Sequence, residues 1–94
     1  MHLLGRDKLN RLQKQNQNLD KWLSVWTSEL LHARWWSTND VLNQFPKAQE
    51  RSNGLFLFQT EPRGYCIKVQ IAFPQGIALI TDLIELIEDN NERH

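Results

Sequence analysis

The chain has 94 residues, of which 40% are hydrophobic, and it carries 11 basic and 11 acidic residues. This length suits one domain with a single modest core, and the apolar content excludes an intrinsically disordered chain. A net charge of zero excludes binding to nucleic acid through overall charge, but it leaves open a local basic patch.

The cysteine and histidine content bounds the chemistry further. The one cysteine, Cys66, excludes an internal disulfide, and the cysteine and histidines lack the spacing of a zinc site. We therefore expect neither a metal nor a cofactor. Residues 1–4 are too short an apolar stretch for a signal peptide, and no apolar run approaches the length of a membrane span. These features predict a cytoplasmic domain over residues 1–94, with no membrane partner.

The first third of the chain predicts a short edge strand and two helices. Residues 1–4 are apolar and end at Gly5, as a short edge strand would. A mainly apolar stripe then recurs at spacings of three and four, the pattern of an amphipathic helix. The stripe comprises Leu9, Leu12, Asn16, Leu19, Leu23, Trp26, Leu30 and Ala33.

Weak helix formers at residues 15–18 interrupt this stripe. We therefore expect two helices, over residues 6–15 and 19–34, the second capped by Asn18 or Asp20. One unbroken helix and a coiled-coil face are the alternatives.

A third, short helix is predicted before the chain becomes strand-like. Ser37 and Asp40 have the spacing of a capping box. The helix should end near Gln44, because Pro46 disfavours helical geometry at the residue before it. Residues 47–53 are polar and predict a connection.

Residues 54–80 predict a three-stranded antiparallel meander. Three short runs rich in β-branched and aromatic residues are separated by turns that contain Pro and Gly. The connections are too short for a parallel crossover. The expected strands are residues 55–58, 65–73 and 77–80.

The middle strand separates two faces, because successive side chains alternate. One face is apolar and should pack in the core: Tyr65, Ile67, Val69, Ile71 and Phe73. The other face carries Cys66, Lys68, Gln70 and Ala72, and it is where we expect binding or chemistry.

The last stretch returns to helical spacing at Leu83, Ile84, Leu86 and Ile87. It predicts a short C-terminal helix capped by Thr81 or Asp82, followed by a polar tail from Glu88. The expected fold class is α+β, with helices on one face of a small sheet.

Several of these features, in this order, resemble the HigB-type toxins of bacterial toxin–antitoxin pairs, which have the RelE-like ribonuclease fold. The resemblance covers about residues 1–80. It includes the opening residues 1–4 and both amphipathic segments. It also includes Trp36-Ser37, Asp40-Val41-Leu42, Phe45-Pro46-Lys47-Ala48 and the strands at 56–58 and 67–73 around a glycine turn.

The resemblance implies an mRNA interferase, a toxin that cleaves messenger RNA, commonly on the ribosome and without a metal ion. In such toxins basic side chains on the sheet hold the phosphate while an acid–base pair moves the 2′-hydroxyl onto it. A cognate antitoxin, expected to be a helix-turn-helix protein, silences the toxin.

Basic residues on and beside the predicted sheet are the candidate site. Lys68 and Arg63 are the candidate catalytic residues, and both also qualify as RNA-binding residues together with Lys47 and Arg51. In a meander these four side chains should form one basic patch, which an antitoxin with acidic and apolar residues would cover.

The adjacent residues Trp35 and Trp36 are the candidate partner-binding residues. They cannot both face the core, so one of them should be available to a partner protein.

The chain departs from the family pattern at its usual catalytic positions. The arginine of the family's middle strand falls here on Ile67 or Lys68. Residues 81–89 lack the histidine and tyrosine of the family's Thr-His-x-x-Tyr-Asp segment. Whether the protein is an enzyme therefore stays open. The alternative is a catalytically degenerate toxin fold that acts as a protein-binding module.

Overall fold

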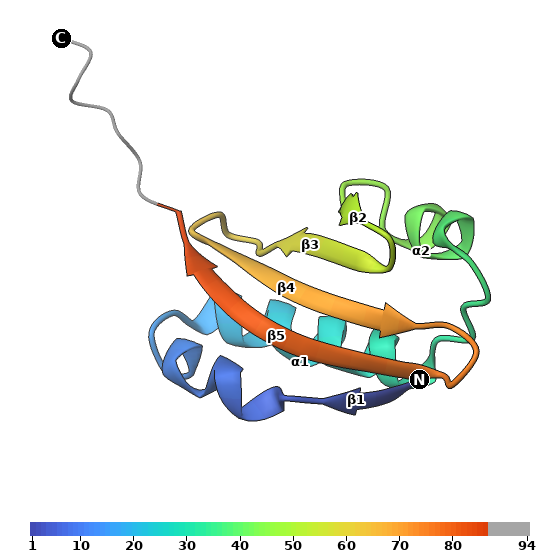
Figure 1. Cartoon of the computed structure of the whole chain (residues 1–94). Coiled ribbons are helices and arrows are strands. Elements are labelled where there is room, and N and C mark those ends of the chain that lie inside the picture. Colours follow the sequence, from blue (N-terminus) through green and yellow to red (C-terminus); the bar gives the residue numbers. More distant parts are fainter. Residues whose placement is uncertain (87–94) are drawn as a thin grey trace, which may run out of the picture.

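A five-stranded sheet with helices over one face is built by residues 1–86, the part of the chain that this computed structural model describes (Figure 1). The elements follow the order β1 (His2–Leu4), η1 (Arg6–Leu12, a 3₁₀ helix), α1 (Gln17–His32), α2 (Thr38–Gln44), β2 (Gln49–Ser52), β3 (Leu55–Gln59), β4 (Tyr65–Ala72) and β5 (Ile77–Glu85). The α+β class is confirmed.

The strands lie in the spatial order β1-β5-β4-β3-β2. Neighbouring strands from β2 to β5 are antiparallel, so the predicted meander is confirmed as β3, β4 and β5. The predicted edge strand is also present, as β1, but it runs parallel to β5 and makes the sheet mixed. Residues 5–76, which include the three helices and the other three strands, separate β1 from β5 and are long enough to allow this parallel pairing.

The N-terminal helices differ from the prediction in their bounds. The first is a 3₁₀ helix that ends at Leu12 rather than at residue 15, and the break before α1 excludes one unbroken helix. Helix α1 begins at Gln17 because Asn16, not Asn18 or Asp20, is its cap. The Oδ1 atom of Asn16 accepts the backbone N–H groups of Asn18 and Leu19 at 2.8 and 3.2 Å.

Helix α2 has the predicted position, but its start is held differently. Ser37 occupies the cap position without a side-chain cap hydrogen bond. The carboxylate of Asp40 instead accepts the backbone N–H of Trp36 at 2.7 Å. The predicted capping hydrogen bond from Ser37 is therefore wrong. Asp40 does accept a backbone N–H before the helix, but from Trp36 rather than from Ser37.

Strand β2 replaces part of the connection predicted over residues 47–53. Its four residues are all exposed, because it is an edge strand paired only with β3. It has no apolar alternation, which is why the sequence pattern missed it. The turn into β3 requires glycine at position 54. Its φ is 78°, and a Cβ atom there would lie 2.7 Å from the Ile71 carbonyl oxygen.

The predicted C-terminal helix is wrong within the described residues, since β5 continues as a strand to Glu85. A register shift lies between the pairs Lys68–Asp82 and Val69–Ile80, so β5 has one extra residue, Thr81. This β-bulge changes the inward spacing from two, between Ala78 and Ile80, to three at Leu83, so the strand alternation is broken just before the apolar residues that suggested a helix. Ile87 and the predicted polar tail lie outside the described residues.

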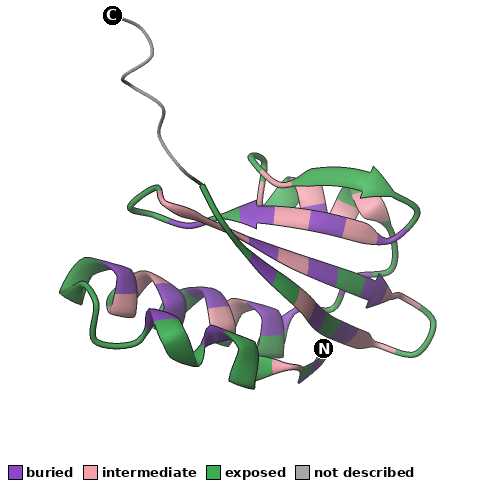
Figure 2. Cartoon of the chain, turned by 60° about the vertical axis from the view of Figure 1, so that its left-hand side comes forward, coloured by how far each residue is buried: buried purple, intermediate pink, exposed green. Residues whose placement is uncertain are grey.

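The core lies between the sheet and α1. Ile67, Val69 and Ile71 are buried, as predicted from the alternation along β4. Figure 2 shows buried residues alternating with less buried ones along β3 and β4. The Trp26 ring of α1 packs edge-on against Phe58 of β3, with ring centroids 5.5 Å apart. Among residues 1–86, no helix is both long and apolar enough to cross a membrane.

Candidate functional site

The face of the sheet that points away from α1 has no described element over it. Figure 1 shows α1 behind β4 and β5, with their other side uncovered. We call this side the open face. Its side chains are Leu55, Leu57 and Gln59 of β3; Cys66, Lys68, Gln70 and Ala72 of β4; and Ile77, Leu79, Asp82 and Ile84 of β5.

A hollow of about 390 Å³, which we call the basic pocket, opens at the β2 side of this face. Its cations come from three separate segments: Lys47 before β2, Arg51 on β2, and Arg63 in the β3–β4 turn. The other lining residues are Gln49, Leu57, Gln59, Cys66, Ile84 and Leu86. Among residues 1–86, no residue that lines the pocket is acidic, so this part of the chain concentrates positive charge there although the whole chain has no net charge.

The buried Thr60 fixes the turn that carries Arg63. Its hydroxyl donates to the Pro62 carbonyl at 2.9 Å, and its backbone N–H donates to the Tyr65 carbonyl at 3.0 Å. The backbone N–H of Tyr65 donates back to the Thr60 hydroxyl oxygen at 3.3 Å. These hydrogen bonds join the two ends of the turn and order its backbone. Arg63, which lines the pocket, is therefore attached to an ordered segment.

Lys68 lies on the open face but does not line the basic pocket. Its partner across the β3–β4 ladder is Leu57, and Cys66 is two residues away on the same face. Both of these residues do line the pocket. Lys68 is therefore next to the pocket, and three of the four residues of the predicted patch meet inside it.

Cys66 is half-buried in the pocket wall. Burial raises the pKa of the Cys66 thiol, and the positive charge of the nearby Arg51 opposes this rise with a smaller effect. The net shift is upward, so the thiol stays protonated at neutral pH. A protonated thiol is a poor nucleophile, and the site does not depend on one.

The described histidines and the tyrosine, side chains often used for proton transfer, do not line the pocket. His2 lies on the edge strand β1, which is separated from β4 by β5. His32 ends α1, with Nδ1 2.8 Å from the Ser28 carbonyl oxygen. The Tyr65 hydroxyl donates to Gln15 at 3.0 Å. Among residues 1–86, no three His, Cys, Asp or Glu side chains gather as a metal site would require.

The two adjacent tryptophans separate as predicted, one inward and one outward. Trp35 is 5% exposed, and its indole N–H donates to the Gln44 side chain at 3.0 Å. Trp36 is 79% exposed, the largest exposure among the large hydrophobic residues of the described chain. Of the two predicted partner contacts, Trp36 is the one available at the surface.

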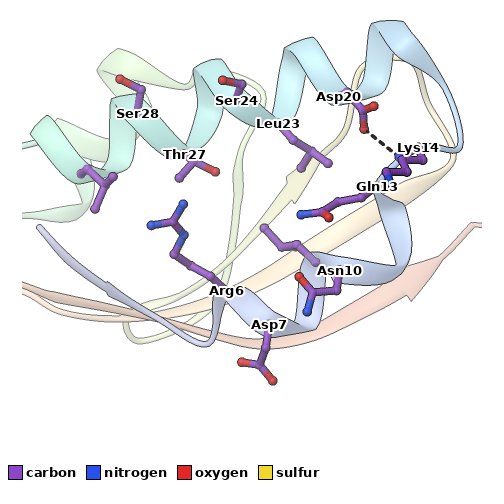
Figure 3. Close-up of a pocket in the computed structure, with 12 residues that line it drawn as sticks. Arg6, Asp7, Asn10, Gln13, Lys14, Asp20, Leu23, Ser24, Thr27 and Ser28 are labelled. Carbon is purple, nitrogen blue, oxygen red and sulfur yellow. Dashed lines mark hydrogen bonds between the residues drawn. The ribbon is translucent and has the colours of Figure 1, made fainter.

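A second and larger hollow, about 680 Å³, lies between η1 and α1. Figure 3 shows Arg6 of η1 reaching toward Thr27 of α1 across it. Its charges cancel: Arg6 and Lys14 against Asp7 and Asp20. We call it the η1–α1 groove. The sequence reading missed it, because its polar residues lie on the sides of two helices that no motif distinguishes.

Comparison of the sequence with models of known protein families and with curated proteins gives no match.

Proposed function

We propose that the open face binds single-stranded RNA and that the protein is a HigB-like toxin that cleaves messenger RNA. The observation that supports this most directly is the convergence of Lys47, Arg51 and Arg63 in one pocket, where the described part of the chain places no carboxylate. Phosphate binding needs such a local concentration of cations, and it does not need a basic chain overall.

The pocket also suits a base or ribose between phosphates. Leu57, Ile84 and Leu86 supply apolar surface beside the guanidinium groups. Arginine can bind phosphate with a bidentate geometry and can stack on a base with its planar group. A volume of about 390 Å³ is in the range of small-molecule sites, which is enough for one nucleotide.

The resemblance to HigB-type toxins supports the reaction class. It implies transfer of the 2′-hydroxyl oxygen onto the adjacent phosphorus without a metal ion, on messenger RNA and in the context of the ribosome. Lys68 and Arg63 are the cations that we assign to the reacting phosphate. Lys47 and Arg51 hold the neighbouring part of the RNA chain.

RNA binding can be tested by fluorescence anisotropy with a labelled single-stranded RNA. Replacing Arg51 and Arg63 together with Gln should weaken binding by about tenfold or more, and should reduce its salt dependence, because two phosphate contacts are lost. The matched control is the Arg6→Gln, Lys14→Gln pair. It removes the same charge from the η1–α1 groove and should leave the affinity within about twofold. Equal losses in both variants would contradict the assignment of the pocket.

The toxin activity has a separate test. Induced expression in a bacterium should arrest growth, and Lys68→Ala should relieve the arrest. Purified protein should cleave RNA in the presence of EDTA. Normal growth with abundant folded protein, together with intact RNA in vitro, would contradict the catalytic proposal while leaving RNA binding to be judged by anisotropy.

A toxin of this kind needs a partner that silences it. We propose an antitoxin whose acidic and apolar residues cover the basic pocket, with the exposed Trp36 as a separate apolar anchor. Trp36→Ala and Lys68→Glu should each weaken the complex with the product of the adjacent gene, and Val25→Ala, another exposed apolar substitution, should not. Binding of both Trp36→Ala and Lys68→Glu as tight as that of the wild type would contradict this surface.

A protein-binding module without catalysis is the second candidate. The observation that favours it is the lack of any imidazole or phenol among the described residues that line the basic pocket. If purified protein binds the antitoxin but leaves RNA intact, this candidate replaces the toxin proposal.

A further inference from the structure

A carboxylate lies directly opposite Lys68 on the open face. Asp82 of β5 is the antiparallel partner of Lys68 of β4. Side chains of directly paired residues point to the same face, with Cβ atoms about 4.5–5.5 Å apart. Next to the basic pocket, the sheet therefore places Lys68 and Asp82 as cross-strand neighbours on one face.

Asp82 reaches this face only because of the β-bulge at Thr81. Ala78 and Ile80 both point into the core, and strict alternation would also send Asp82 inward. The bulge instead turns Asp82 outward and places Leu83 in the core at 9% exposure. The Thr81 hydroxyl donates to the Lys68 carbonyl at 3.3 Å, which ties the bulge to the strand it faces. Bulges commonly re-aim side chains beside active sites.

The carboxylate is exposed and also oriented. Its Oδ1 atom accepts the backbone N–H of Leu83 at 2.8 Å, and the side chain as a whole is open to solvent. Leu57, on the other side of Lys68, lines the basic pocket. A nucleotide whose phosphates contact the pocket cations can therefore extend its ribose toward Lys68 and Asp82.

We propose that Asp82 is the general base of RNA cleavage and that Lys68 protonates the leaving group, an inference that rests on the proposed ribonuclease function. Asp82 takes the proton of the ribose 2′-hydroxyl, and the 2′-oxygen forms a bond to phosphorus. The bond from phosphorus to the 5′-oxygen breaks, and that oxygen receives a proton from the Lys68 ammonium. The products are a 2′,3′-cyclic phosphate and a 5′-hydroxyl end.

The pairing also explains how the site resets. After one turnover Asp82 carries the extra proton and Lys68 lacks one. Because the two side chains are cross-strand neighbours, a water molecule between them can return the proton from Asp82 to Lys68 without any change in the fold.

A purely electrostatic role for Asp82 predicts the opposite result. A carboxylate that only balances the charge of Lys68 would repel RNA phosphate. Its removal would then strengthen RNA binding and leave cleavage unchanged or faster. The general-base role predicts that removal leaves binding intact and stops the reaction. The cleavage rate therefore distinguishes the two roles, and the affinity measured on the same variant shows that the RNA is still bound.

The experiment compares Asp82→Asn with Glu85→Gln by single-turnover cleavage and by RNA anisotropy. Asparagine keeps the oxygen that accepts the Leu83 N–H but cannot take a proton. Glu85 is exposed on the same strand and pairs with Tyr65, away from Lys68, so its variant is a control of equal charge. We expect Asp82→Asn to lower the cleavage rate by about 100-fold or more with RNA affinity equal to or above the wild type. The Glu85→Gln rate should stay within about twofold.

The role of Lys68 has its own readout. Lys68→Arg keeps the positive charge but has a pKa too high for efficient proton donation, so it should bind RNA and cleave slowly. An RNA with sulfur in place of the bridging 5′-oxygen needs no acid at its leaving group. It should restore cleavage by Lys68→Arg and not by Asp82→Asn.

Two outcomes would overturn the inference, and they differ in whether the ribonuclease proposal survives. Cleavage by Asp82→Asn at the wild-type rate or faster refutes the general-base role and leaves the ribonuclease proposal standing. Wild-type protein that binds RNA without cleaving it refutes both.

Discussion

The two faces of the sheet are made from alternate residues of the same strands, yet they have opposite characters. On β4, Ile67 and Val69 are fully buried under α1, whereas Cys66 and Lys68, the residues that precede them, are only partly covered. The covered face holds the fold together through apolar burial. The open face keeps its charged residues at the surface, and the basic pocket lies at its β2 edge.

The difference teaches that alternation predicts a face well only where the strand itself keeps a regular period. On β4, the covered side chains Ile67, Val69 and Ile71 keep that period and are all buried. The open face depends on two irregular features, an edge strand without apolar residues and a bulge in β5. Both irregular features carry residues of the proposed site.

The largest contrast should appear in how much the protein is destabilised by substitutions at two adjacent residues of β3. Phe58 is 2% exposed and packs against Trp26 and Phe45, so Phe58→Ala should lower the free energy of unfolding by about 3–5 kcal/mol. Leu57→Ala, on the open face, should lower it by about 1 kcal/mol or less. Urea unfolding followed by tryptophan fluorescence measures both. Similar losses in the two variants would mean that the open face is covered in solution.

Much of the fold could be predicted from the sequence, because the helices and the central strands have a regular spacing of apolar residues. The class, the α1 and α2 segments and the three-stranded meander all follow from spacing and turn residues. The cap of α1 was misplaced by two residues or more, because Asn16, Asn18 and Asp20 are all acceptable cap residues. Only the tertiary arrangement, in which Asp20 accepts the Lys14 N–H at 3.2 Å, separates their roles.

The basic residues of the candidate site could be predicted from the sequence, but its acidic residue, Asp82, could not. Lys47, Arg51 and Arg63 are candidates by residue type, and the pairing of β2 with β3 helps to bring them together. Asp82 was assigned to the cap of a helix, because the bulge at Thr81 breaks the strand period at that point. A bulge leaves only an irregular spacing in the sequence. The cross-strand partner of Lys68 can therefore be identified only from the register of the folded sheet.

A smaller effect should come from the turn that joins the edge strand β2 to β3. Gly54→Ala would adopt a positive φ and place its Cβ 2.7 Å from the Ile71 carbonyl oxygen, so we expect a loss of about 2–3 kcal/mol. Gly76→Ala has a similar φ of 68° but no atom within 4 Å of the added Cβ. It should lose only about 1 kcal/mol, as the left-handed backbone alone requires.

The comparison of these two glycine variants tests how firmly the pocket edge is built. Both unfolding free energies come from the same urea titration, and RNA anisotropy on Gly54→Ala reports whether Arg51 keeps its place. Equal destabilisation would show that the β2–β3 turn shifts away from Ile71 to accommodate the added Cβ. The backbone at the edge of the pocket would then be easily displaced.

The smallest expected effect concerns the Cys66 thiol, a half-buried group of the open face in the wall of the basic pocket. Burial raises its pKa and the Arg51 charge lowers it by less, so its alkylation should accelerate only at a pH above that of an ordinary thiol. Arg51→Gln removes the opposing charge and should shift the midpoint of the rate profile to still higher pH. Arg6→Gln, which removes a charge from the distant η1–α1 groove, should leave the midpoint unchanged. Iodoacetamide labelling across pH 7 to 11, read by mass spectrometry, gives the three midpoints. A wild-type midpoint at or below that of the urea-unfolded chain would show that the pocket wall is open to water and that Cys66 belongs with the exposed residues of the open face.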